Sequence, residues 1–458
     1  MRSSAMSAPR FPPLLNRPPL PLIVGALFAL LLLGLYLSSP PTPSLPTNIP
    51  AHDRLANFRP VSEVRWAIIG CGDVTEKKSG PALSLIPYSR LVMVMRRNGS
   101  LAQDYAERHK VARWSTSAEE TINHPDVNAV YIATPHRYHA QYAMMAAQAG
   151  KPAYVEKPMG MSHVDSSAIL SAFQRAKLPL FVAYYRRALP NFLRIKALLQ
   201  SGAIGDVLSV QVVYHRPPNK YDYQWAISGV PSQRELQTML QEQQQQQQQQ
   251  QGEGNGKGKE DGAQQQHQQQ HQQRQYPHRP PPQHHPAGAS LYNASLKWRV
   301  DPLVGGLGGY FRDKGSHHLD LLDFWFGPIV AASGWSTNLA GLYPSPDTIT
   351  AHFRFFNGIV GTGSWNFAAG KSSQQEYGEI TGSSGRIKFQ FFLSNKVELW
   401  NDTGHHEWDD PSPTHVQQPL LATVVSALRG AGECPSEGES AIRTSFILDK
   451  IVTGEKWP

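Results

Sequence analysis

The first residues whose types and spacing suggest chemistry are glycines that follow an apolar run. Gly70-Cys71-Gly72-Asp73-Val74-Thr75 comes directly after residues 65–69, which are expected to form a strand. Glycines at the end of a strand allow a tight turn and let backbone N–H groups approach a pyrophosphate. We therefore expect Gly70, Cys71, Gly72, Asp73 and Val74 to hold a dinucleotide. Thr75 replaces the third glycine of the usual fingerprint, so a simple strand-to-loop turn is the alternative.

A pair of arginines, Arg96 and Arg97, follows the second apolar run at residues 90–95. An acidic residue at this point would accept hydrogen bonds from the ribose hydroxyls of NAD. Guanidinium groups suit a 2′-phosphate instead, because they form charge-assisted hydrogen bonds with it. The pair therefore predicts that NADP(H) is preferred, with NAD(H) as a possible cofactor. Two surface arginines without a ligand are the alternative.

Strand and helix patterns alternate over the segment that carries these residues. Apolar runs at 65–69, 90–95, 129–133, 152–155 and 180–183 are separated by helical periodicity at 101–109, 139–149 and 163–177. Alternation of this kind predicts βαβ units and a parallel sheet. We expect an N-terminal doubly wound Rossmann domain that binds NAD(P) over residues 61–183.

After residue 184 the pattern changes to consecutive strands. Strands are expected at 207–214, 329–335, 348–355, 359–365, 376–382, 387–392 and 396–400, with helices at 191–199, 317–325, 420–429 and 441–452. Turn signals such as Asn357-Gly358 separate several of the strands. The fold class is therefore predicted to be α/β, with a C-terminal α+β domain, residues 184–458, built on a large and mostly antiparallel sheet.

Two segments are expected to lie outside the domains. Residues 231–290 contain an unbroken glutamine run, 243–251, and too little apolar surface to offset their ordering entropy, so a disordered insertion is predicted. Residues 1–60 contain an uncharged apolar run at 20–37, three preceding arginines and a proline-rich stretch at 40–50. This order is typical of a single-pass membrane anchor or a signal peptide followed by a stalk, with an organelle transit sequence as the alternative.

Composition narrows the classes of partner. The net charge of +8 and the isoelectric point near 9.3 come from scattered basic residues, so no nucleic-acid partner is predicted. Cys71 and Cys434 are the only cysteines, too few for a disulfide framework or a cysteine-based zinc site, and no metal is expected.

Further motifs make the pattern more specific. Val130-Tyr131-Ile132-Ala133-Thr134-Pro135 and His139 precede the triplet Glu156-Lys157-Pro158, and Asp313-Lys314-Gly315-Ser316-His317 follows much later. Together with the glycine turn, these motifs resemble the Gfo/Idh/MocA oxidoreductase family over residues 64–452 without the insertion. The chain is similar to the branch that contains dihydrodiol dehydrogenases and anhydrofructose reductases. The resemblance also suggests a homodimer formed through the antiparallel sheet.

The resemblance implies catalytic roles for Lys157, His317 and Asp313. Lys157 matches the family's catalytic lysine, whose ammonium can stabilise negative charge on a reacting oxygen. His317 matches the proton donor or acceptor, and Asp313 lies four residues earlier, so on a helix the two share a face. The Asp313 carboxylate is then expected to orient the imidazole or to bind the substrate. A solvent-facing lysine and a structural Asp–His pair are the alternatives.

Other site residues follow from the same resemblance. Thr134, Pro135 and His139 lie at the carboxyl end of a strand, where Rossmann ligands bind. Glu156, Lys157 and Pro158 are expected to shape the cofactor pocket, with a cis bond before the proline. Substrate contacts are expected from Tyr185, Arg187, Asp313 and His317, although Tyr185 replaces the asparagine that is common at its position.

The predicted function is reversible hydride transfer between a nicotinamide and a secondary alcohol or carbonyl. The substrate is expected to be a carbohydrate, a sugar-like polyol or a cyclic diol. In such enzymes the cofactor supplies the hydride chemistry and the protein supplies position and proton traffic. A dinucleotide-binding sensor or regulator without turnover is the alternative. Because a sensor needs no proton relay, the retention of Lys157, Asp313 and His317 favours the enzyme.

Overall fold

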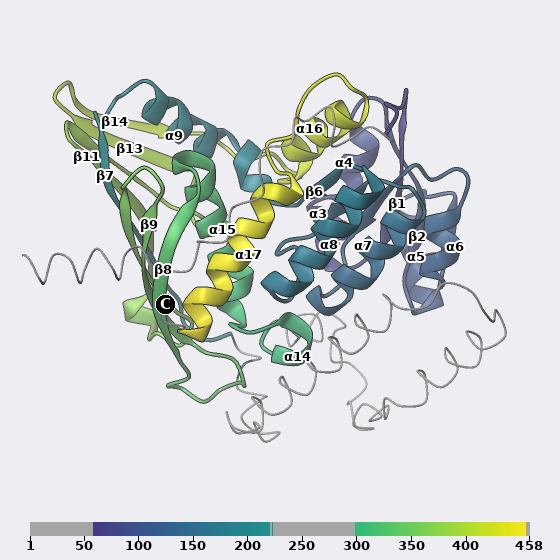
Figure 1. The fold of residues 1–458 in the computed structure, drawn as a ribbon, viewed down its shortest axis with the longest axis horizontal. Helices are drawn as coiled ribbons and strands as arrows, with labels where there is room; N and C mark the ends of the chain where they lie inside the picture. The colour runs from purple at the N-terminus through teal and green to yellow at the C-terminus, as the bar shows by residue number, and fades with distance from the viewer. Residues whose placement is uncertain (1–57, 220–221, 223–297, 455–458) are drawn as a thin grey trace, which may run out of the picture. The chain divides into compact units, whose positions relative to one another are not determined.

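The computed structural model describes residues 58–219, 222 and 298–454, and these residues build two sheets with helices around them (Figure 1). The first sheet has six parallel strands in the order β3-β2-β1-β4-β5-β6, which is the order of a dinucleotide-binding Rossmann fold. The second has eight strands in the order β14-β13-β12-β11-β7-β10-β9-β8. The predicted fold class is confirmed.

Apart from the edge strand β3, the strands of the first sheet are largely buried on both faces, as expected where helices cover a parallel sheet. Every residue of β4, β5 and β6 is buried. The strands are β1 (Val64–Ile69), β2 (Ser89–Met95), β3 (Arg113–Ser115), β4 (Ala129–Ile132), β5 (Ala153–Val155) and β6 (Leu180–Val182). The helices around them are α3 (Asp73–Lys77), α4 (Gly80–Leu85), α5 (Gly99–Arg108), α6 (Ala118–Asn123), α7 (His139–Gln148) and α8 (His163–Ala176), with the 3-10 turn η1 (His136–Tyr138).

A short helix that the sequence pattern did not indicate follows the glycine turn. The first predicted helix was at 101–109, but α3 starts at Asp73, immediately after Gly72. Asp73 and Glu76 lie in its first turn, where acidic side chains interact favourably with the helix dipole. A helix of five residues is too short to produce a detectable apolar period. The backbone therefore turns into a helix directly beside the expected phosphate site.

The second sheet is antiparallel except where β7 and β10 pair in parallel. Its strands are β7 (Val207–His215), β8 (Ile329–Thr337), β9 (Thr348–Phe355), β10 (Val360–Asn366), β11 (Gln375–Gly382), β12 (Gly385–Phe389), β13 (Lys396–Asn401) and β14 (Gly404–Asp409). Buried and exposed residues alternate along β9, so one face of the sheet packs on the core and the other lies open.

The sequence pattern missed two edge strands. β14 reads Gly-His-His-Glu-Trp-Asp and buries none of its residues, so it carries no apolar alternation. β3 has three residues, two of them exposed. An edge strand is held by hydrogen bonds to one neighbour, and it needs little apolar surface of its own.

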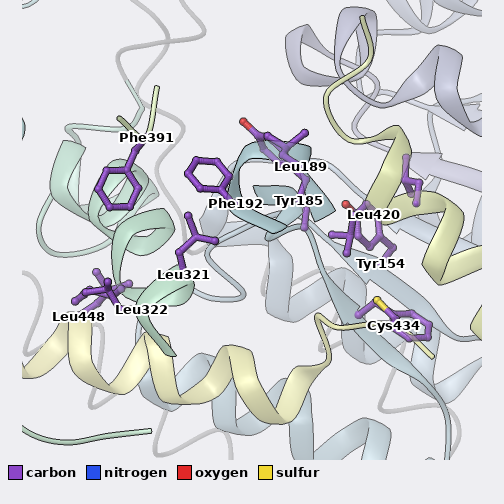
Figure 2. Packing of buried hydrophobic residues seen from close by; sticks show 14 of the residues in the cluster. Tyr154, Tyr185, Leu189, Phe192, Leu321, Leu322, Phe391, Leu420, Cys434 and Leu448 are labelled. Atoms are coloured by element: carbon purple, nitrogen blue, oxygen red, sulfur yellow. The ribbon is translucent and has the colours of Figure 1, made fainter. Parts of the chain in front are cut away.

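Helices and turns join the two sheets into one packed body. They are η2 (Tyr185–Ala188), α9 (Pro190–Gln200), α14 (Pro302–Gly305), α15 (Tyr310–Phe326), η4 (Lys371–Ser373), α16 (Gln418–Leu428) and α17 (Gly438–Thr453). α17 packs on β8 and α15 on one side and on α8 on the other (Figure 1). One hydrophobic cluster runs from Tyr154 of the first sheet through Phe192 and Leu321 to Phe391 (Figure 2). A continuous core of this kind fixes the two sheets against each other.

The prediction of a membrane anchor needs correction. Within residues 58–219, 222 and 298–454, no helix is long and apolar enough to cross a membrane. This finding contradicts the expected membrane association and the localisation derived from it. The apolar run at 20–37, on which the prediction rested, and the whole glutamine-rich segment at 231–290 lie outside the described residues.

Candidate active site

A cavity of about 930 Å³ lies between the two sheets. Its first wall is formed by the glycine turn after β1, by residues 96–98 after β2 and by residues 133–136 after β4. Its second wall, called here the substrate wall, is formed by η2, the end of β7, the first turns of α15 and Phe392. Carboxyl ends of parallel strands are where Rossmann folds bind their ligands.

The glycine turn has the conformation and the open space that a dinucleotide needs. Gly70 has φ +91, and a Cβ atom on it would lie 2.6 Å from Cγ2 of Thr134. Gly72 is different: a Cβ there would meet no atom closer than Gly70 O, at 3.8 Å, so its backbone faces open space. Gly70, Cys71, Gly72, Asp73 and Val74 all line the cavity. A larger side chain at residue 72 would fill the space that a pyrophosphate requires.

Arg96 and Arg97 lie at the edge of the same wall, at the end of β2. Arg96 Nη1 donates a hydrogen bond to Cys71 O at 3.2 Å, which ties the arginine to the glycine turn. Arg97 Nη1 donates to the hydroxyl of Tyr138 at 3.2 Å, and its guanidinium lies over that ring at 4.8 Å. Both side chains keep further N–H groups that a phosphate can accept from.

The segment after β4 contributes an unpaired hydroxyl. Thr134 and Pro135 line the cavity, and the Thr134 Oγ1 atom is buried with no hydrogen-bond partner among the described residues. Unsatisfied buried polar atoms are uncommon, and one beside an open cavity fits a polar ligand atom. The donors and acceptors on this wall are therefore compatible with a dinucleotide.

His139 and Pro158 do not line this cavity, contrary to the expectation that they contact the cofactor. His139 is buried, with Nδ1 3.1 Å from Pro158 O and Nε2 2.9 Å from Thr134 O. The imidazole thus connects the backbone after β4 with the backbone after β5 and acts as a structural brace. The bond between Lys157 and Pro158 is cis, as expected.

Glu156 belongs to a buried hydrogen-bond network behind Lys157. Its Oε1 atom accepts from the Tyr131 hydroxyl at 2.8 Å and from Gln417 Nε2 at 2.6 Å, and its Oε2 accepts from the Lys157 backbone N–H at 3.2 Å. A carboxylate with several donors holds a fixed orientation. Glu156 lines the cavity and fixes the peptide from which Lys157 projects.

The predicted catalytic residues meet across the gap between the two sheets. Lys157 follows β5, and its Nζ atom lies 2.7 Å from Asp313 Oδ1 and 2.8 Å from Asp313 O on α15. Burial alone would raise the pKa of Asp313, but the positive charges of Lys157, Lys314 and Arg299 hold it well below its ordinary range. Asp313 is therefore ionised at neutral pH. Its recorded partners are cations, and no hydrogen bond to His317 is present among the described residues.

His317 lies one helical turn after Asp313, on the face of α15 that lines the cavity. Its ring packs edge-on against Tyr185, with the two centroids 5.3 Å apart. Burial, helped by the positive charges of Lys157, Arg186 and Lys314, holds the pKa of His317 well below its ordinary value. The imidazole is thus neutral at pH 7, and its buried Nδ1 has no partner within the described part of the chain.

Arg187 does not reach the cavity, contrary to its expected substrate contact. Its Nε and Nη2 atoms donate to the two carboxylate oxygens of Asp320 at 2.9 and 2.7 Å, deep in the core. The neighbouring Arg186 lines the cavity instead, because adjacent residues of the 3-10 turn η2 point in different directions. Sequence reasoning missed Arg186 for this reason.

Other lining residues were also missed. They include Lys78, Tyr214, Arg216, Trp298, Lys314 and Phe392. Lys314 carried a signal, since it stands inside the Asp-x-x-x-His motif. Burial lowers its pKa to about 7, and its Nζ lies 4.8 Å from the centre of the Phe392 ring. The others come from segments distant in sequence, and only the packing of the two sheets places them together.

Comparisons with known proteins agree with this geometry. Residues 64–184 match the family described as "Oxidoreductase family, NAD-binding Rossmann fold", and residues 278–388 match the "GFO/IDH/MocA C-terminal domain". The chain is 31% identical to Oxidoreductase P35 of Formosa agariphila over 85% of its own length and 98% of the relative's. It is 29% identical to trans-1,2-dihydrobenzene-1,2-diol dehydrogenase of Danio rerio, but over 37% of this chain and 48% of that protein.

Solved structures show the same fold. A levoglucosan dehydrogenase in complex with NADH and levoglucosan matches with a TM-score of 0.63 and 19% identity, covering 86% of this chain and 97% of that one. An oxidoreductase from Agrobacterium radiobacter in complex with NAD+, L-tartaric acid and magnesium matches with a TM-score of 0.62 and 16% identity, covering 84% and 94%. By its two matched domains and its full-length relative, the chain belongs to the GFO/IDH/MocA family of NAD(P)-dependent oxidoreductases.

Proposed function

We propose that this chain is an NADP(H)-dependent oxidoreductase that transfers a hydride between the nicotinamide and a secondary alcohol or carbonyl of a sugar-like polyol or a cyclic diol. Residues 61–183 form the cofactor domain in this proposal, and residues 184–458 form the substrate domain. The observation that carries the proposal is the contact of Lys157 with Asp313 beside a neutral His317. These groups face a cavity whose other wall holds the glycine turn.

The preference for NADP(H) rests on Arg96 and Arg97. They stand after β2, where an acidic side chain would select the ribose hydroxyls of NAD. The carboxylate nearest in sequence after β2, Asp104, is engaged by Arg108 on the exposed side of α5. A 2′-phosphate would receive charge-assisted hydrogen bonds from the two guanidinium groups.

Each proposed catalytic group has a defined task. The nicotinamide, when bound, supplies or accepts the hydride. Lys157, held by Asp313, donates a hydrogen bond to the reacting oxygen and stabilises negative charge on it. His317 is uncharged, so it accepts the hydroxyl proton when the alcohol is oxidised and returns the proton when the carbonyl is reduced. Tyr185 and Phe392 pack around the imidazole and exclude water from it.

Steady-state turnover tests this proposal. The purified chain is mixed with NADPH and a panel of ketoses, aldoses and diketones, and with NADP+ and the corresponding polyols and cyclic diols, and absorbance of the reduced nicotinamide is followed. We expect turnover with members of the panel, and we expect this turnover to fall about a hundredfold or more in Lys157→Met. Cofactor binding without turnover of any member would contradict the proposal and would favour a dinucleotide sensor.

A further inference from the structure

The substrate wall has more basic side chains than carboxylates to neutralise them. Arg186, Arg216 and Lys314 lie on it, Lys157 and Arg299 line the cavity beside it, and Asp313 is the carboxylate among the described residues of that wall. Lys157 takes the closest contact with Asp313, at 2.7 Å, while Arg299 and Lys314 lie 3.5 and 3.8 Å from its other oxygen. One carboxylate is therefore shared by three basic side chains. Burying cations without a compensating anion is costly.

Arg186 has no carboxylate partner within ion-pair distance among the described residues. It is 6% exposed, and its Nε donates to Phe391 O at 3.1 Å. Its Nη1 atom is buried without any hydrogen-bond partner in the described part of the chain. Two aromatic rings lie close to it, with the guanidinium 4.1 Å from the centre of the Phe392 ring and 4.9 Å from that of Tyr185. The buried carboxylate of Glu376 lies beyond ion-pair distance, although the Arg186 charge still acts to lower its pKa. An unpaired buried donor next to a cavity is the signature of a missing acceptor.

Arg186 and Lys314 lie beside the same aromatic ring. Each packs against Phe392, whose centre is also 5.8 Å from that of the His317 imidazole, and the charge of Arg186 contributes to lowering the pKa of Lys314. An anion bound by the two cations would thus lie beside the proposed proton acceptor. The phosphates of a dinucleotide belong elsewhere, because the glycine turn and Arg96 and Arg97 are on the opposite wall.

A neighbouring phenol responds to the same positive field. Burial alone would raise the pKa of Tyr185, yet it is lowered, because the charges of Arg186 and Lys78 outweigh the burial. The positive potential therefore extends across the substrate wall.

We propose that the substrate of this site is a polyol or sugar that carries an anionic group, a carboxylate or a phosphate, bound by Arg186 and Lys314. The proposal rests on the oxidoreductase function above and specifies the substrate class of the same site. The anion neutralises the excess charge and anchors the molecule, which places a nearby hydroxyl or carbonyl between Lys157 and His317.

Binding of three matched probes tests the proposal without knowledge of the natural substrate. Glucitol, gluconate and glucitol 6-phosphate share a six-carbon polyol skeleton and differ in charge. Each is titrated calorimetrically into the NADP+-loaded protein. We expect at least one of the two anions to bind about tenfold or more tightly than glucitol, as a charge-assisted contact implies. Whichever of gluconate and glucitol 6-phosphate gains more affinity relative to glucitol shows whether a carboxylate or a phosphate is the recognised group.

Variants separate this effect from nonspecific attraction. Arg186→Gln and Lys314→Gln should each reduce the anion-to-glucitol affinity ratio several-fold, while Arg186→Lys retains part of it. Arg354→Gln removes one charge at an exposed position of β9, outside the cavity. It should leave the ratio unchanged. Titration with the cofactor confirms that each variant is folded. If Arg186→Gln does not fold, the affinity ratio measured for Lys314→Gln decides the test.

Two results would overturn the inference: equal binding of the anions and glucitol, including no measurable binding of any of them, or a ratio that survives both substitutions. Hydride transfer is scored separately from nicotinamide absorbance. Turnover by the unmodified protein without any anion preference contradicts the inference alone. Anion preference without any turnover contradicts the proposed oxidoreductase function instead.

Discussion

The ammonium of Lys157 lies 2.7 Å from the carboxylate of Asp313, although 156 residues separate them along the chain. One residue follows a strand of the first sheet, and the other lies in the first turn of α15. The contact therefore joins the cofactor side of the cavity to the substrate wall. It also holds the Lys157 ammonium where the reacting oxygen of a substrate would lie between the cofactor and the substrate wall.

Replacing Lys157 tests whether this ammonium acts in the transition state. Lys157→Met should lower kcat about a hundredfold to a thousandfold, because it removes a preorganised charge from the reacting oxygen. The dissociation constant of NADPH, measured by fluorescence titration, should change little. Lys177→Met, an exposed position that caps the C-terminal end of α8 outside the cavity, serves as the control. Near-normal turnover in Lys157→Met would remove the central claim.

The pH dependence of turnover tests the state of His317. Because burial and three nearby cations lower its pKa well below 6.5, the imidazole stays neutral as the pH falls through 6.5. A lowered pKa means that protonation, and so loss of the base, occurs only at more acidic pH. We therefore expect the acidic limb of kcat/KM for alcohol oxidation to lie below pH 6.5. In His317→Asn this limb should disappear, with kcat reduced about a hundredfold or more. A limb centred at or above pH 6.5 would contradict the assignment.

Sequence reasoning predicted the parts of the fold that have local patterns. The glycine turn, the buried parallel strands and the alternating strands of the second sheet all carry such patterns, and the structure confirms them. Helical spacing also predicted that Asp313 and His317 share a face of one helix, and both line the cavity. The role expected for Asp313 was different, however, because its recorded partners are Lys157, Lys314 and Arg299.

The failures share a physical cause, which is that side-chain direction depends on packing between distant segments. Arg186 and Arg187 are adjacent, and no local rule decides which of them enters the core. Asp320, more than a hundred residues later, decides it by pairing with Arg187. His139 lies at the expected strand end, but each of its ring nitrogens is within hydrogen-bond distance of a backbone carbonyl oxygen, so neither is directed toward the cavity. The excess of basic side chains on the substrate wall was missed for the same reason, because these side chains come from distant segments that meet only in the folded chain.

The choice of cofactor depends on the arginines after β2, and Arg97 is the better one to replace. Arg96 also supports the glycine turn through Cys71 O, whereas Arg97 contacts a side chain, Tyr138. Arg97→Ala should weaken NADPH binding roughly tenfold to a hundredfold, since a hydrogen bond to a charged group contributes about 1.5–3 kcal/mol. NADH binding should be nearly unchanged, so the ratio of the two dissociation constants is the measurement. Equal affinities of the unmodified protein for NADPH and NADH would contradict the preference.

The last prediction concerns Arg187, which the structure assigns to the core rather than to the substrate. Both oxygens of Asp320 accept hydrogen bonds from it, and the two side chains are 3% and 1% exposed. Arg187→Met should lower the free energy of unfolding by about 3–5 kcal/mol, because it leaves the carboxyl group of Asp320 buried without its partner. The denaturation midpoint in urea measures this loss.

A second Arg–Asp pair provides the matched control. Arg194 also bonds both oxygens of Asp410, but the arginine side chain is 34% exposed. Arg194→Met should therefore cost no more than about 1 kcal/mol, as is usual for pairs in contact with solvent. The double variant Arg187→Met, Asp320→Leu should recover much of the lost stability, since it leaves no unpaired charge in the core. If Arg187→Met instead kept its stability and raised the substrate KM, Arg187 would be a substrate contact, and its neighbour Arg186 would lose its assigned place in the site.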